Sequence, residues 1–186
     1  MKMATWRYTE SNSVEMADEG AAAAAAAPTS DSVTSEQFTE SADDDSSVDL
    51  AYSDLQLFPY SILESCPQQI RSLHISNNNI ADLPPEVGLF ANLITLDISS
   101  NCLKSIADEI CNLRHLRTFV ARNNCLSVES IPKDFGTLSS LAVLNLSGNQ
   151  LVQLPVQFTE LSQLRCLYLG ANQISVIPPE VQNMSK

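Results

Sequence analysis

One pattern of apolar residues recurs every 23 to 25 residues along most of this chain. In the stretch LAVLNLSGNQLVQLP, which begins at Leu141, leucines are spaced by three and then by two residues, and Asn149 follows. The same pattern begins at residues 70, 93, 116, 141 and 164, so the spacings are 23, 23, 25 and 23. A fixed period of this length predicts a solenoid, in which each coil buries its apolar face against its neighbours.

Each copy opens with the pattern LxxLxL, which places alternate apolar residues on one face of a short strand. We expect strands from successive copies to lie side by side in a curved parallel sheet on the concave side. Segments such as LPPEVGLFAN carry Pro in their first turn, which predicts short helices or 3₁₀ turns on the convex side. The predicted fold is therefore an α/β solenoid.

An asparagine occupies the same position in every copy of the pattern. Its side chain carries both a carbonyl and an NH₂ group, so stacked asparagines can satisfy backbone groups of their own turn and of the neighbouring coil. Leaving one such buried group without a partner costs about 1–3 kcal/mol. We interpret the five asparagines as a structural ladder: Asn78, Asn101, Asn124, Asn149 and Asn172.

The chain divides into three kinds of segment. Residues 1–47 are rich in Ser, Thr, Asp, Glu and Ala, and this composition predicts a disordered acidic, Ala-rich tail. Residues 48–69 fit the pattern poorly, with Ser53 in the place of the asparagine, and predict an atypical N-terminal capping repeat with a polar outer side. Five repeats follow: 70–92, 93–115, 116–140, 141–163 and 164–186.

Two features set single repeats apart. In the third, Ala121 stands where a large residue is expected, an apolar deficit that Phe119 can offset, and two added residues predict a bulge after Leu126. The fifth repeat reaches Lys186 with no polar cap after it. A bare apolar edge is therefore expected, and either the chain is truncated at its C-terminus or a partner covers that edge. The edge comprises Leu164, Leu167, Leu169, Ile174 and Ile177.

The repeated LPxxVxxLxxL segments, together with the asparagine ladder, resemble the short intracellular class of the leucine-rich repeat family over roughly residues 50–186. Two stretches, LRTFVARNNCLSVESIPKDF with its two-residue insertion and LRCLYLGANQISVIPPEVQN, resemble one particular member more closely. The resemblance implies a protein-binding scaffold without catalysis.

The net charge of −12 is unevenly distributed, because residues 1–50 hold eleven of the 22 acidic side chains. The repeats have no basic face that could neutralise phosphates, which argues against nucleic-acid binding. No run of 18 apolar residues predicts a membrane span, and the N-terminal MKMATWRYTESNS is not a secretory signal. Five isolated cysteines then favour a reducing, cytoplasmic location, with the nucleus left open.

No pattern typical of a catalytic site occurs, so we expect no enzyme, no cofactor and no metal. The histidines, His74 and His115, are far apart in register. Cys102 and Cys125 each follow a ladder asparagine in adjacent coils, and strands about 4.8 Å apart would bring them within disulfide reach. A redox or metal pair is thus geometrically possible, although two thiols without further ligands make a poor zinc site.

The residues between the apolar positions of each strand point out of the concave sheet. They form a mixed face that contains Arg and Tyr, which are enriched among interface hot spots. We predict that this face binds a protein; a merely solvated face is the alternative. The predicted site residues are His74, Asp97, Arg117, Val120, Arg122, Asn145, Arg165 and Tyr168.

These features predict a non-catalytic intracellular protein–protein interaction module. It would serve as a signalling scaffold or as the substrate-recognition subunit of a ubiquitin ligase. The alternative is the docking domain of a larger enzyme, such as a poly(A) deadenylase, with its catalytic domain beyond Lys186. An extracellular receptor is disfavoured by the missing export signal. The partner is a protein of unknown identity, and we expect no obligate homo-oligomer.

Overall fold

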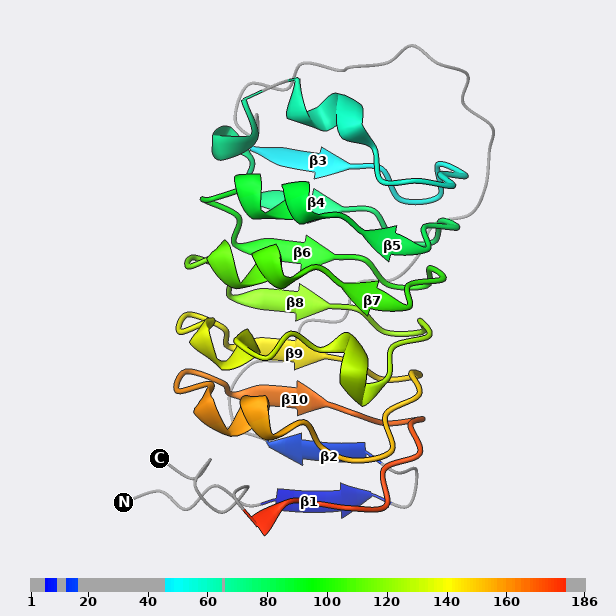
Figure 1. Ribbon diagram of the computed structural model, residues 1–186, viewed down its shortest axis with the longest axis vertical. Helices are drawn as coiled ribbons and strands as arrows, with labels where there is room; N and C mark the ends of the chain where they lie inside the picture. The colour runs from blue at the N-terminus through cyan, green and yellow to red at the C-terminus, as the bar shows by residue number, and fades with distance from the viewer. Residues whose placement is uncertain (1–5, 10–12, 17–45, 65, 180–186) are drawn as a thin grey trace.

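Stacked coils form the main body of the computed structural model, which describes residues 6–9, 13–16, 46–64 and 66–179 (Figure 1). Each coil contributes one strand to a six-stranded parallel sheet, and the strands follow one another in chain order. The predicted solenoid is confirmed. The strands are β3 (Ser47–Asp49), β4 (Ser72–His74), β6 (Thr95–Asp97), β8 (Thr118–Val120), β9 (Val143–Asn145) and β10 (Cys166–Tyr168).

The central residue of each strand points into the solenoid. Leu73 pairs with Leu96, and the same register continues through Phe119 to Leu144 and Leu167. All five side chains are buried. Because side chains alternate along a strand, the residues on either side of this row face outward.

Short 3₁₀ turns run along the side opposite the sheet (Figure 1). Pro85 opens the turn η3, where its missing N–H removes no intrahelical hydrogen bond. None of the helices described is long and apolar enough to cross a membrane. The turns are η1 (Tyr60–Leu63), η2 (Pro67–Gln69), η3 (Pro85–Leu89), η4 (Asp108–Asn112), η5 (Val128–Ser130), η6 (Phe135–Thr137) and η7 (Val156–Glu160).

Three phenylalanine rings pack in the core of the third and fourth repeats. Ala121 is fully buried. The ring of Phe119, on the same strand segment, lies 6.1 Å from that of Phe135, which in turn lies 5.6 Å from Phe158. Contacts at these distances add to the stabilisation that comes from apolar burial.

The insertion in the third repeat forms the turn η5 directly after Leu126, where the bulge was expected. In the two preceding coils, β5 (Asp82–Leu83) and β7 (Ser105–Ile106) form a second, two-stranded parallel sheet. In the third repeat, the η5 turn lies beside β7, at the position where a further strand of this small sheet would lie. The Ser130 hydroxyl within it donates a hydrogen bond of 2.6 Å to the Lys104 carbonyl of the coil before.

The first coil joins the sheet through β3, which pairs in parallel with β4. It has no ladder asparagine, and the Asn78 carbonyl oxygen instead accepts two hydrogen bonds from it, from the N–H groups of Ser53 and Leu55, both 3.0 Å long. Two large apolar side chains of this coil are exposed, Tyr52 at 80% and Leu57 at 73%.

Two strands lie within the N-terminal tail, for which composition predicts disorder. β1 (Trp6–Thr9) pairs antiparallel with β2 (Ser13–Met16), and β2 lies alongside β10 (Figure 1). These two segments contain β-branched and aromatic residues, which favour strands. The rest of the tail, up to residue 45, lies outside the described residues.

The apolar edge of the last coil is much smaller than expected. Leu164, Leu167 and Leu169 are buried, because they point into the interior of the solenoid, and the β1–β2 pair lies beside their strand. Ile174 is half-buried. Of the five residues predicted to form a bare edge, Ile177 alone is exposed, at 58%.

Candidate functional site

One row of outward-facing residues crosses the whole sheet. His74, Asp97 and Val120 are paired in register, and the row continues to Asn145 and Tyr168. The structure therefore brings five of the eight predicted site residues into one line of half-buried side chains.

A sixth member of this row was missed by the sequence analysis. Asp49 pairs with His74 at the N-terminal end of the row and is exposed. The signal was present in the sequence, because Val48, Asp49 and Leu50 repeat the apolar–outward–apolar order of the later strands.

Three polar members of the row bond to the backbone just beyond their own strands. Asp49 accepts a hydrogen bond from the N–H of Ala51 (3.0 Å). Asp97 accepts one from Ser99 (2.9 Å), and Asn145 one from Ser147 (3.0 Å). Each of these bonds joins the side chain to the backbone N–H two residues later, so it restricts the orientation of the side chain. His74, Val120 and Tyr168 occupy the same position on the alternate strands β4, β8 and β10.

The predicted arginines do not lie in this row. Arg122 is exposed just after β8. Arg117 and Arg165 are exposed just before β8 and β10, in a second row that also contains Arg71. Backbone hydrogen bonds of 2.7–2.8 Å connect that row from coil to coil, through Arg71, Ile94, Arg117, Ala142 and Arg165. The candidate site is thus two parallel rows and Arg122.

The asparagine ladder connects adjacent coils. The Asn124 carbonyl oxygen accepts a hydrogen bond from the Leu103 N–H (3.0 Å), and its NH₂ group donates to the Ile98 carbonyl of the preceding coil (3.1 Å). Asn78, Asn101, Asn149 and Asn172 are bonded in the same way to the coil before their own. Four of the five are buried, and Asn172 is half-buried.

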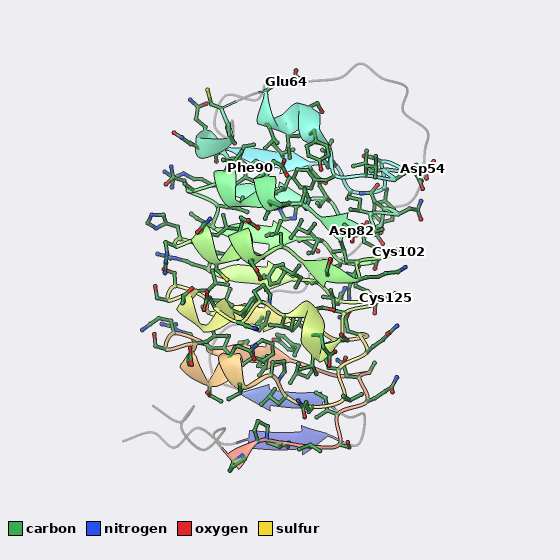
Figure 2. The ribbon with its side chains drawn as sticks, viewed as in Figure 1. Asp54, Glu64, Asp82, Phe90, Cys102 and Cys125 are labelled. Carbon is green, nitrogen blue, oxygen red and sulfur yellow. The ribbon has the colours of Figure 1, made fainter. Side chains whose placement is uncertain are left out.

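Cys102 and Cys125 lie in adjacent coils at the end toward which the strands point (Figure 2). Cys102 is exposed, Cys125 is half-buried, and both are free thiols. Burial, and then the nearby carboxylates of Asp134 and Asp108, raise the pKa of Cys111 to about 11. In the described part of the chain, no three His, Cys, Asp or Glu side chains are grouped so that they could hold a metal ion.

The profile of the family described as "Leucine-rich repeat region" matches residues 69–186. Leucine-rich repeat-containing protein 58 of Xenopus tropicalis is 40% identical over 93 residues, which are 50% of this chain and 26% of that protein. It is the individual protein that the third and fifth repeats resemble, and that resemblance is confirmed. The chain spans about a quarter of the length of the curated relatives from Xenopus that it matches.

Solved structures of other proteins superpose on the stacked coils of this chain. A TDR receptor superposes with a TM-score of 0.63 and 26% identity, over 74% of this chain and 24% of that one. The ectodomain of the receptor kinase GASSHO1/SCHENGEN3 from Arabidopsis thaliana, solved in complex with CASPARIAN STRIP INTEGRITY FACTOR 2, has a TM-score of 0.59 and 29% identity. It covers 68% of this chain, and this chain covers 15% of it.

Proposed function

The chain belongs to the leucine-rich repeat family, whose repeat arrays are protein-interaction modules, and we propose that its outward sheet face binds a protein partner. The residues that carry this proposal are those of the two rows together with Arg122. The GASSHO1/SCHENGEN3 ectodomain supports the proposal as a similar repeat array that was solved in complex with CASPARIAN STRIP INTEGRITY FACTOR 2.

The observation behind the proposal is the continuity of the face. Six strands in register give an uninterrupted surface on which His74, Val120 and Tyr168 alternate with the polar Asp97 and Asn145. Tyr side chains offer a large contact area at a low cost in conformational entropy, and the Arg guanidinium presents five N–H donors, which favours both as anchors. A face of this kind suits an extended or convex protein surface better than a small substrate.

Within this class we propose that the chain acts as a signalling scaffold or as the substrate-recognition subunit of a ubiquitin ligase. The alternative is that it is the docking domain of a larger enzyme, such as a poly(A) deadenylase. A ligase subunit would shorten the lifetime of its partner. Proteasome inhibition should then raise the partner's level only in cells that contain this protein. We also propose a reducing, cytoplasmic location, because the five cysteines are separate thiols.

The docking face is tested by capturing partners with the wild type and with the double variant Arg122→Glu, Tyr168→Ala. Partners identified by proximity labelling should be lost with the variant, while its thermal unfolding stays within a few degrees of the wild type.

The matched control is Lys133→Glu with Val156→Ala. It reverses one exposed charge and truncates one exposed apolar side chain outside the sheet. Its partners should be those of the wild type. Undiminished capture by the Arg122 and Tyr168 variant would show that neither Arg122 nor the outward row of Tyr168 is the docking surface.

A further inference from the structure

Charge is segregated on this acidic chain. The segments that lead into the last five strands of the sheet are 68–71, 91–94, 114–117, 139–142 and 162–165, here called the strand-entry flank. These segments contain four arginines and no acidic residue. Three of the 3₁₀ turns that precede the flank, η3, η4 and η7, in contrast carry acidic residues: Glu86, Asp108, Glu109 and Glu160.

Three of the four flank arginines form an evenly spaced set. Arg71, Arg117 and Arg165 lie before β4, β8 and β10, with Ile94 and Ala142 between them in the same backbone ladder. Neighbouring strands lie about 4.8 Å apart. Arginines on every second coil are therefore about 9.6 Å apart.

These three guanidinium groups are available to a ligand. All three side chains are exposed, and none forms an ion pair within the described part of the chain. The fourth flank arginine differs, because the Arg114 guanidinium donates a hydrogen bond of 3.2 Å to the Thr137 carbonyl of the next coil. The Arg114 guanidinium is thus held by a neighbouring coil, whereas no such bond to the described residues holds the guanidinium groups of Arg71, Arg117 and Arg165.

The distance of about 9.6 Å between successive arginines matches the repeat of one extended peptide conformation. A polyproline II segment has three residues per turn and rises about 3.1 Å per residue, so every third side chain lies on one side, about 9.3 Å from the last. In a β-strand, residues three apart point to opposite faces and could not all reach the arginines. A polyproline II segment that crosses the strands therefore matches the two-coil spacing.

We propose, on the basis of the docking function above, that the strand-entry flank binds an acidic polyproline II segment of the partner protein. Carboxylates at every third residue of that segment pair with Arg71, Arg117 and Arg165. Guanidinium–carboxylate pairing can be bidentate, which adds geometric specificity to charge. Exposed pairs are individually weak, so the flank contributes register and orientation, and the outward row contributes further contacts.

Two isomeric peptides test the spacing. Fluorescein-labelled Glu-Pro-Pro-Glu-Pro-Pro-Glu and Glu-Glu-Glu-Pro-Pro-Pro-Pro have the same composition and charge. In anisotropy titrations with the full chain, the spaced peptide should bind at least about three-fold more tightly, since only it can reach all three arginines. Its binding should weaken as salt is raised.

Variants locate the site. Arg117→Gln removes the middle arginine and should weaken the spaced peptide about three-fold. Lys133→Gln removes one exposed positive charge outside the flank and should leave its binding unchanged. Equal binding of the two isomers, equal loss in both variants, or binding of neither peptide would overturn the proposal.

The titration also separates this inference from the proposed function. If partner capture depends on Arg122 and Tyr168 while the peptides fail to discriminate, the docking face stands and the ligand chemistry is wrong. If the spaced peptide binds through Arg117 but capture survives the double variant, the partner docks on the flank and not on the outward row.

Discussion

Single asparagines connect the coils of this solenoid, and Asn124 gives the sharpest test of their contribution. Its side chain satisfies the Leu103 N–H and the Ile98 carbonyl, and it is buried. Asn124→Ala should lower the free energy of unfolding by at least about 1–3 kcal/mol, the cost of one unsatisfied buried group. Urea titration followed by circular dichroism measures the change.

Asn92→Ala is the matched control for that variant. Asn92 also donates an amide hydrogen bond to the preceding coil, to the Gln68 carbonyl at 2.9 Å, but the bond is exposed. Water can replace it, so the change in unfolding free energy should stay below about 0.5 kcal/mol. Similar losses in the two variants would mean that burial of the ladder does not decide its strength.

Thiol reactivity should follow burial. The pKa of Cys111 rises from 9.0 to about 11, first because of burial. Near pH 8, where the reactive thiolate is scarce for such a group, iodoacetamide should modify the exposed Cys66 and Cys102 well before Cys111. Peptide mass spectrometry at timed intervals gives the order, and labelling of Cys111 as fast as Cys102 would contradict it.

The same pKa shift has a consequence for stability. Folding holds the Cys111 thiol in its neutral form, so the stabilisation is complete below pH 9.0 and is lost as the pH rises toward about 11. Cys111→Ser should flatten this part of the pH dependence of the unfolding free energy. An unchanged alkaline loss in that variant would assign the loss to other groups.

At the scale of elements, adjacent 3₁₀ turns depend on glycine for their close approach. A Cβ added at Gly136 in η6 would lie 2.6 Å from the Cβ of Glu160 and 2.8 Å from the Gln157 carbonyl oxygen, both in η7. Overpacking of this kind costs about 1–3 kcal/mol. Gly136→Ala should therefore lower the unfolding free energy in a urea titration by that amount.

Gly88→Ala supplies a graded comparison. Its added Cβ would lie 2.9 Å from both the Cβ and the carbonyl oxygen of Glu109, a milder overlap than at Gly136. The loss of stability should be smaller than for Gly136→Ala. The reverse order would show that the turns move apart without cost and that their spacing is not fixed by packing.

The elements also show what could be predicted from sequence. The LxxLxL pattern predicted the register of the five strands from β4 to β10, because a slip of one residue would turn Leu96 or Leu144 out of the core. The rows of the candidate site followed from that register. The backbone bonds of Asp97 and Asn145 could not be predicted, because they depend on the local turn and not on the repeat. Nor could β2 beside β10, because that contact joins residues remote in sequence.

At the scale of the whole molecule, stability depends on contacts between neighbouring coils. No coil buries its leucines alone, and the sheet and the asparagine ladder run through the array without a break. Such coupling predicts that a destabilising substitution in the first coil lowers the stability of the last coil as well. Phe58 is suited to this substitution, because it is buried in the first coil and its ring lies 6.4 Å from that of Phe90.

Phe58→Ala should lower the unfolding free energy by about 3 kcal/mol, the lower end of the range for a buried phenylalanine. Amide hydrogen exchange locates the effect. If the array unfolds as one unit, the most protected amides of β6 and of the distant β9 lose the same free energy of protection. Leu57→Ala, at a neighbouring position that is 73% exposed, should leave both strands unchanged. Loss of protection confined to β3 and β4 would show instead that the coils unfold one after another from the N-terminal end, and that the docking face keeps its shape when the cap is lost.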